Sequence, residues 1–259
     1  SSASSSAGPL RPGGEVLRPI VREDELSPPR LEGHDAAPMD VRLHNLSVVF
    51  RDRNGAAVPV LDIPSLTIAA GQQVCLVGGS GSGKTTLLNT VAGIVLPTAG
   101  QGLFDDTDVA AFSEARRDHF RAQHVGYVFQ TFNLLQGLTA LENVSLPAHF
   151  AGGSQAATRE RARSLLERVG LSHRMDARPG TMSVGEQQRV AIARAVINQP
   201  TVVLADEPTA NLDVKNGDEV LGLLKEAASE AQSILMLVTH EPRVQGYFED
   251  VRPLQEVSR

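Results

Sequence analysis

Hydrophobic positions recur from residue 40 onward in a pattern typical of alternating strands and helices. Residues 41–50 alternate imperfectly between apolar and polar side chains, which predicts a half-buried strand, and a second run covers residues 60–68. A turn-rich segment, residues 52–55, separates these two runs. Short, mostly apolar runs predict four buried strands at residues 73–77, 125–129, 201–205 and 234–238.

Helical patterns lie between these strands. A helix is predicted from about Lys84 to Val95, where Pro97 would stop it. Residues 131–182 are predicted to be mainly helical, and a long helix opens at Ser183. Because buried strands that alternate with helices favour a parallel sheet covered on both faces, the pattern predicts an α/β fold with a helical subdomain at about residues 131–182.

The first 38 residues have a different composition. They open with Ser-Ser-Ala-Ser-Ser-Ser, hold six of the fifteen prolines and show no hydrophobic period. Such a segment buries too little apolar surface to offset its ordering entropy, so residues 1–38 are predicted to be a disordered tail and residues 39–259 the folded domain. The tail has neither the apolar core of a secretory signal nor the low acidity of a transit peptide. Met39 is a candidate natural start, which the sequence leaves open.

Charge and cysteine content narrow the classes of function. The net charge is −6, of which −2 falls in residues 1–38 and −4 in the rest, so neither part is a basic arm that would bind nucleic acid through its phosphates. The single cysteine, Cys75, cannot form an internal disulfide, which fits a reducing compartment, and it is interpreted as a small core residue. No apolar run approaches the roughly 18 residues of a membrane helix, so any membrane role would need a partner.

The strongest chemical signal is the segment from Gly78 to Thr85, which matches the phosphate-loop pattern G-x-x-x-x-G-K-[ST]. Its glycines allow backbone N–H groups to approach phosphate oxygens, and the following helix adds the positive end of its dipole. The pattern assigns Lys84 to the β- and γ-phosphates and the Thr85 hydroxyl to Mg²⁺. A flexible Gly/Ser loop is the competing interpretation, but the preceding strand and following helix disfavour it. The candidate nucleotide-binding residues here are Gly78, Gly79, Ser80, Gly81, Ser82, Gly83, Lys84, Thr85 and Thr86.

Two carboxylates follow the apolar strand at residues 202–205. Asp206 stands where a phosphoryl-transfer enzyme anchors its metal, and Glu207 is the candidate base or orienter of the attacking water. The competing interpretation is that Asp206 and Glu207 are two solvated acids at the end of a strand, which is a common arrangement. The phosphate loop elsewhere in the chain favours the catalytic interpretation, because enzymes with this loop need such an aspartate.

A third signal is the segment Met-Ser-Val-Gly-Glu-Gln-Gln-Arg at residues 182–189. Ser183 with Glu186 forms a capping box, which alone would mark only a helix start. Its spacing resembles that of the ATP-binding cassette (ABC) superfamily, whose signature is Leu-Ser-Gly-Gly-Gln, and residues 189–195 match the following helix. Ser183 lies 99 residues after Lys84, and Asp206 lies 23 residues after Ser183. The resemblance implies a P-loop NTPase core of parallel strands with an inserted helical subdomain and a small antiparallel β part.

The resemblance also implies a role for a second copy of the chain. In the family, the helix start at Ser183 and Gly185 binds the γ-phosphate held by the other protomer, so that a head-to-tail homodimer encloses two ATP molecules. Asp213, in Asn-Leu-Asp, matches the loop that couples the two sites. Two departures from the signature are Met182 and Val184. A β-branched residue resists positive φ and occupies space near the phosphate, so Val184 is expected to weaken, but not abolish, ATP sandwiching.

Three more residues gain roles by resemblance. Gln130 matches the glutamine that senses Mg²⁺ and the attacking water, and would otherwise be an ordinary surface amide. His240 matches the switch histidine that contacts the γ-phosphate; a lone histidine is more often structural. Phe50 lies near where the family stacks an aromatic ring, usually tyrosine, on adenine, with a core phenylalanine as the alternative. The candidate catalytic residues are thus Glu207, His240, Gln130 and Lys84, and the candidate Mg²⁺ ligands are Thr85, Gln130 and Asp206.

The resemblance covers about residues 40–245 and implies an ATPase subunit, with ATP and Mg²⁺ as cofactors, that powers a separate membrane permease. Residues 141–144 and 204–213 look most like the lipoprotein-release and macrolide-export branch. The subunit would then lie at the cytoplasmic face of the inner or plasma membrane, held through its partner alone. An apolar group could receive a short permease helix or belong to a buried core helix: Phe132, Leu134, Leu135 and Leu138.

Other classes share parts of this pattern. A regulatory ABC ATPase, such as one that controls cell-wall hydrolases, would share every motif. DNA-repair ABC proteins insert a long coiled coil between the phosphate loop and the signature, and the intervening residues here show no heptads. Translation-linked ABC proteins usually carry two cassettes, and a small-molecule kinase would have no reason to carry the signature segment.

Overall fold

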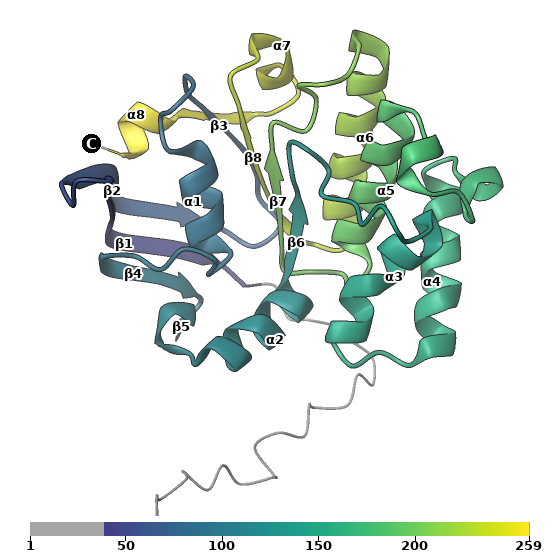
Figure 1. The fold of residues 1–259 in the computed structure, drawn as a ribbon. Coiled ribbons are helices and arrows are strands. Elements are labelled where there is room, and N and C mark those ends of the chain that lie inside the picture. The colour runs from purple at the N-terminus through teal and green to yellow at the C-terminus, as the bar shows by residue number, and fades with distance from the viewer. Residues whose placement is uncertain (1–38, 259) are drawn as a thin grey trace, which may run out of the picture. The chain divides into compact units, whose positions relative to one another are not determined.

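The structure is a computed structural model that describes residues 39–258; the predicted tail at residues 1–38 lies outside this range. Two sheets and the helices around them make an α/β fold, as the sequence predicts (Figure 1). The strands are β1 (Val41–Arg51), β2 (Ala57–Ile68), β3 (Gln73–Val77), β4 (Ala99–Phe104), β5 (Thr107–Asp108), β6 (Val125–Val128), β7 (Val202–Asp206), β8 (Ile234–Thr239) and β9 (Asp250–Pro253). The helices are α1 (Lys84–Val91), α2 (Glu114–His124), α3 (Ala140–Phe150), α4 (Gln155–Arg168), α5 (Val184–Val196), α6 (Val214–Glu230), α7 (Pro242–Gln245) and α8 (Leu254–Val257), with short 3-10 turns η2 (Val109–Ala111), η3 (Ser172–Arg174) and η4 (Pro179–Thr181).

The central sheet is parallel, with strand order β6-β7-β8-β3-β9. Strands β7 and β8 are buried along their whole length, which explains their almost unbroken apolar sequences. In the register, Val77 of β3 lies opposite Thr239 of β8, and Asp206 of β7 lies opposite Val238. The loops that follow β3, β7 and β8 therefore leave the sheet at one edge, where open α/β sheets bind their ligands.

Side chains cover both faces of this sheet. On one face, a core cluster joins the sheet to α1 and to the antiparallel sheet β2-β1-β4-β5. On the other face, α5 and α6 pack on the alternate residues of the same strands (Figure 1). The antiparallel sheet is the small β part that the family resemblance implies.

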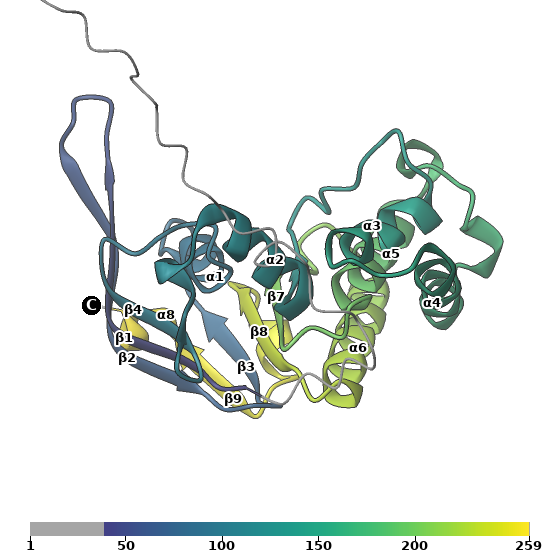
Figure 2. The ribbon, with the colours of Figure 1, turned by 90° about the horizontal axis from the view of Figure 1, so that it is seen from below.

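Residues 131–182 contain α3, α4, η3 and η4, and no strand is assigned within that range. These helices pack with α5 around a third cluster of buried side chains. Figure 2 shows α3, α4 and α5 on the side of the parallel sheet away from β1 and β2. Helices α2 to α6 each begin at a residue whose side chain caps them, and Thr139 and Ser183 form complete capping boxes. None of the helices at residues 39–258 is long and apolar enough to cross a membrane.

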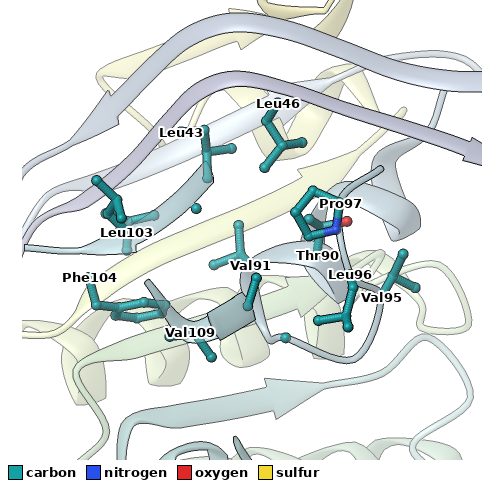
Figure 3. Close-up of a pocket in the computed structure, with 14 residues that line it drawn as sticks. Leu43, Leu46, Thr90, Val91, Val95, Leu96, Pro97, Leu103, Phe104 and Val109 are labelled. Atoms are coloured by element: carbon teal, nitrogen blue, oxygen red, sulfur yellow. The ribbon is translucent and has the colours of Figure 1, made fainter. Parts of the chain in front are cut away.

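One helix ends earlier than its pattern predicts. The helix expected to reach Val95 stops at Val91, because Ala92 caps it and Gly93 adopts a φ of +65°. Beyond this end lies a small cavity between α1 and the antiparallel sheet (Figure 3). Its lining side chains are apolar except for Thr90, whose hydroxyl donates to the Thr86 carbonyl 2.7 Å away. The cavity is therefore a packing gap lined by apolar side chains, apart from the already bonded Thr90 hydroxyl.

Candidate functional site

The loop between β3 and α1 has the backbone geometry of an anion cradle. Gly81 and Gly83 adopt φ values of +77° and +92°. A Cβ atom on Gly83 would lie 2.9 Å from both Leu61 Cδ2 and the Val60 carbonyl oxygen, so only glycine fits there. Gly83 caps α1 without a side-chain hydrogen bond, which leaves the first-turn N–H groups of the helix without a capping side chain. Such a helix start binds phosphate oxygens.

Lys84 is a buried cation at the head of this helix. Its Nζ donates to the carbonyl oxygens of Gly78 and Gly79, at 2.7 and 2.8 Å, and lies 3.5 Å from Glu207 Oε1. Beside it, the buried hydroxyl of Ser82 has no hydrogen-bond partner. A buried ammonium with an unpaired hydroxyl nearby fits an anionic phosphate group, because both could donate to its oxygens.

Asp206 and Thr85 form the candidate metal site. The Thr85 hydroxyl donates to Asp206 Oδ2 at 2.7 Å. Burial raises the pKa of Asp206, the Thr85 hydrogen bond opposes this shift, and the charge of neighbouring Glu207 adds to it. Two adjacent buried carboxylates with a hydroxyl beside them suit a hard divalent cation such as Mg²⁺, which prefers oxygen ligands and binds through one or two carboxylates plus substrate phosphates.

Glu207 is held by groups at the end of β8. Its φ is +44°, and its N–H donates to the Val238 carbonyl at 3.0 Å. Oε2 accepts from the Thr239 hydroxyl at 2.9 Å and from the His240 backbone N–H at 3.3 Å, while Oε1 lies 2.8 Å from His240 Nδ1. A non-glycine residue with positive φ persists only where its surroundings fix it, and such residues cluster at functional sites. The carboxylate is thus buried and oriented.

These groups line a single cleft of about 760 Å³, measured with its part open to solvent. The cleft brings together four loops that are far apart in the sequence: the glycine loop and the segments after β6, β7 and β8. Its lining includes most of the candidates named from the sequence: Ser80, Gly81, Ser82, Gly83, Lys84, Thr85, Thr86, Gln130, Asp206, Glu207 and His240. Gly78 and Gly79 do not line the cleft themselves, but their carbonyl oxygens accept the Lys84 hydrogen bonds.

Besides Gly78 and Gly79, four candidate residues do not line this cleft. Phe50 is 43% exposed on β1, opposite Val58 of β2. Ser183 and Gly185 lie at the start of α5, and Asp213 caps α6 by accepting from the Asn216 N–H at 3.1 Å. That backbone hydrogen bond is the main cause of a lowered pKa for Asp213.

The two helix starts lie side by side. A Cβ atom on Gly185 would lie 3.3 Å from Asn216 Oδ1. Ser183 completes a capping box with Glu186, which also pairs with Arg174 at 3.0 Å. Although partial burial opposes it, hydrogen bonds from Ser183 and Arg174 lower the pKa of Glu186 and keep it ionised.

Val184 differs from expectation in one respect. It is the first residue of α5 and has no positive φ, so the valine adopts its backbone conformation without strain. Its side chain is 44% exposed. The expectation of backbone strain at Val184 is therefore wrong. The expectation that its exposed side chain occupies space near the phosphate still stands as a prediction.

Sequence reasoning missed two residues of the site. Val60 of β2 lines the cleft because the antiparallel sheet packs against the glycine loop, and no local pattern signals that contact. Thr239 is fully buried and donates to Glu207. Its place directly before His240, at the end of a buried strand, is the one signal that would have found it.

Comparisons with known proteins give one family. A sequence model described as ABC transporter matches residues 61–210. An uncharacterised ABC transporter ATP-binding protein of Mycobacterium tuberculosis is 48% identical over 76% of this chain and 59% of its own length, so the chain spans less than two thirds of that relative. The lipoprotein-releasing system ATP-binding protein LolD of Saccharophagus degradans is 44% identical over 71% of this chain and 81% of its own length.

Solved structures give the same result for the fold. A dimeric ATP-binding cassette, MJ0796, in a post-hydrolysis state with ADP and phosphate, superposes with a TM-score of 0.75 at 36% identity. The match covers 82% of this chain and 92% of that one. A second dimeric structure of the same cassette, described as a bacterial ABC transporter cassette, matches with the same TM-score at 35% identity.

Proposed function

The chain belongs to the ABC transporter family, and we propose that it is the subunit that binds and hydrolyses ATP to power a separate membrane permease. One observation carries the proposal. A buried lysine, a hydroxyl–carboxylate pair and a second, oriented carboxylate converge on one cleft beneath a glycine loop. This set matches what phosphoryl transfer requires: a phosphate cradle, a metal anchor and a group that orients water.

The reaction is ATP plus water to ADP plus inorganic phosphate. A water oxygen attacks the γ-phosphorus in line, the bond from that phosphorus to the β–γ bridging oxygen breaks, and ADP leaves with that oxygen. Glu207, held by Thr239 and His240, orients the water and accepts its proton. Lys84 and the glycine-loop N–H groups stabilise the charge that develops on the phosphates. Mg²⁺ held by Thr85 and Asp206, with Gln130 on the same cleft, would neutralise charge on the β- and γ-phosphates.

We further propose that a second copy completes the site. Ser183, Gly185 and Asp213 lie at adjacent helix starts outside the cleft of their own chain, where another copy can reach them. A helix start is a suitable partner for a terminal phosphate. The match to a cassette described as dimeric supports a head-to-tail arrangement with two enclosed ATP molecules.

The membrane partner and location are proposals of the same kind. Phe132, Leu134, Leu135 and Leu138 lie in the loop between β6 and α3, so they do not form the core helix considered above. Leu134 is buried against α3 and α5, whereas Leu135 is 48% exposed and free to meet a permease helix. We therefore place the chain at the cytoplasmic face of a membrane, held through that partner, and the similarity to LolD favours a lipoprotein-release type of system.

Phosphate release tests the proposal. The wild-type chain is expected to release phosphate from ATP with Mg²⁺, and Lys84→Ala to lose this activity by about 10²-fold or more. Arg163→Ala, which removes an exposed cation of α4, is the matched control and should behave as wild type. Wild-type protein that releases no phosphate, or Lys84→Ala at the wild-type rate, would overturn the assignment. Transport by the complex with its co-purified permease then separates a transporter from a regulatory ATPase.

A further inference from the structure

The loop that carries Gln130 contains two consecutive residues in a strained conformation. Phe132 and Asn133 adopt φ values of +59° and +49°, although neither is glycine. Positive φ is uncommon for such residues, and a pair of them persists only when surrounding groups hold the backbone. The local bond from the Asn133 N–H to the Thr131 carbonyl, at 2.6 Å, closes the turn but does not anchor it to the fold.

Two side chains hold this loop: Asn143 of α3 accepts from the Leu135 N–H at 2.8 Å and donates to the Leu135 carbonyl at 3.1 Å, and Arg194, near the end of α5, holds the strained turn itself. Its Nη1 donates to the Asn133 carbonyl and its Nη2 to the Phe132 carbonyl, each at 2.6 Å. The planar fork of a guanidinium suits this contact, because two separate nitrogens each face one carbonyl; a lysine would have to reach both carbonyls from a single nitrogen on a shorter side chain. Arg194 is thus hydrogen-bonded to both carbonyls of the strained turn at the same time.

Within the described residues, the carbonyls of Phe132 and Asn133 are the hydrogen-bond partners of Arg194. No ion pair found in residues 39–258 includes it, and burial lowers its pKa to about 10, so it remains charged at neutral pH. A cation with restricted access to water and no carboxylate beside it is costly unless its hydrogen bonds offset the lost hydration. Its two bonds to the loop are therefore the interactions that offset this cost.

Helix α5 connects this anchor to the segment proposed to meet the second copy. Ser183 caps the start of α5, and Arg194 follows 11 residues later, roughly three helical turns away. The helix between them is firmly packed: its buried side chains contact both the sheet and α3. A further hydrogen bond holds Gln130 itself: Asn211, in the loop before α6, donates from Nδ2 to the Gln130 carbonyl at 3.1 Å.

We propose that Arg194 is a positioning residue that fastens the Gln130 loop to α5, so that contact of the Ser183 end with the other copy's nucleotide shifts Gln130 in its own cleft. The inference rests on the proposed ATPase function and deepens it. It supplies a physical connection from one nucleotide site to the other. Gln130 touches the reacting region, whereas Arg194 acts through the loop alone.

Hydrogen exchange on the nucleotide-free protein tests the anchor itself. Arg194→Lys keeps the charge and most of the side-chain length but replaces the two donor nitrogens by one, which weakens the contact with the two carbonyls. Amide exchange at residues 131–135 should then rise about ten-fold or more, the effect of losing one charge-assisted hydrogen bond, while exchange at residues 78–91 stays unchanged. Arg168→Ala, which breaks surface pairs of α4 with Glu226 and Glu230, is the control and should change neither region. Unchanged exchange at residues 131–135, or a rise throughout the chain, would overturn the proposal.

The coupling between the Ser183 end of α5 and the Gln130 loop is tested by measuring the same hydrogen exchange with ATP bound. In the wild type, adding ATP under conditions that block hydrolysis should slow exchange at residues 131–135 as the dimer forms. In Arg194→Lys, ATP should bind with unchanged affinity and the dimer should form, but this slowing should be lost and the turnover number should fall about ten-fold. Equal slowing in both proteins would contradict the coupling. A wild type that binds no ATP would instead contradict the proposed function, while the nucleotide-free exchange still decides the anchor.

Discussion

Oε1 of Glu207 lies 2.8 Å from Nδ1 of His240, although 33 residues separate the two in the sequence. The contact arises because β7 and β8 are neighbouring parallel strands that end in register, Asp206 opposite Val238. Thr239, the last residue of β8, adds a second bond to the same carboxylate. The register of β7 and β8 therefore determines the orientation of the Glu207 carboxylate, which orients the attacking water in the proposed mechanism.

Replacing Glu207 by glutamine should slow ATP hydrolysis strongly while ATP remains bound. The amide cannot accept the proton of the attacking water, so turnover should fall about 10²–10⁴-fold, or roughly 3–5 kcal/mol of transition-state stabilisation. Phosphate release and filter-bound ATP measure the two quantities. The exposed Glu249→Gln is the control. Hydrolysis at the wild-type rate in Glu207→Gln would show that another group orients the water.

Asp206→Asn should stabilise the protein in the absence of nucleotide and metal. Burial raises the pKa of Asp206, so the folded chain holds this proton to a higher pH than the unfolded chain does. The protonated Asp206 therefore contributes to the free energy of unfolding at low pH, and this contribution is lost as the pH rises from the unfolded-state pKa to the folded-state pKa. At neutral pH the neutral asparagine should therefore raise the Tm by a few degrees, with a smaller gain at acid pH.

Thermal unfolding across pH, with the exposed Asp62→Asn as the control, measures this difference. Because the same substitution removes a charged metal ligand, Mg²⁺ should stabilise the ATP-bound variant less than the ATP-bound wild type. A variant whose Tm is lower than that of the wild type at neutral pH would contradict the assignment of Asp206 as a desolvated carboxylate.

Val184→Gly should strengthen ATP-driven dimerisation. The backbone at this position is unstrained, so the gain would come from removing an exposed side chain at the helix start. Glycine there costs the helix up to about 1 kcal/mol, and Val184→Ala separates the two effects because alanine favours the helix. Gel filtration with ATP, in the Glu207→Gln background, measures the dimer. If both variants dimerise only as readily as the protein with Val184, the valine side chain has no effect on ATP-driven dimerisation.

Two glycine-to-alanine substitutions should change stability in opposite directions. A Cβ atom on Gly126 of β6 would lie 2.3 Å from the Ala195 carbonyl oxygen, a backbone atom that cannot move aside. Gly126→Ala should therefore lower the free energy of unfolding by more than about 2 kcal/mol. Gly222, inside α6, has open space at its Cβ position, so Gly222→Ala should raise that free energy by about 0.5–1 kcal/mol. Denaturant unfolding of the pair checks both signs.

The sequence was sufficient for the parts whose signal is local. The glycine loop, the carboxylates after β7 and the capping box at Ser183 each depend on residues close together in the chain. Buried strands such as β8 were predicted because all of their side chains are apolar and covered. The structure adds the reason that these segments meet at one cleft: the parallel strands before them share a carboxyl edge.

The parts that were missed depend on distant contacts. Strand β4, with the sequence Ala-Gly-Gln-Gly-Leu-Phe, has no alternation and is a strand because β1 pairs with it. Helix α2 buries only Gln123, so it carries no apolar stripe. Strand β9 contains Pro253 and is half-buried, yet it pairs with β3. The hydrogen bonds from Arg194 to the Gln130 loop likewise connect residues that are about 60 positions apart in the sequence.

The central claim is that the glycine loop of one copy and the Ser183 helix start of another enclose the same ATP. Cross-linking tests it directly: in a Cys75→Ala, Glu207→Gln background, one preparation carries Ser80→Cys and the other Val184→Cys, both at exposed positions. Mixed under mild oxidation, the two should give a disulfide-linked heterodimer that needs ATP to form. A mixture that binds ATP yet gives no such product, or that gives as much product without nucleotide, would contradict the account.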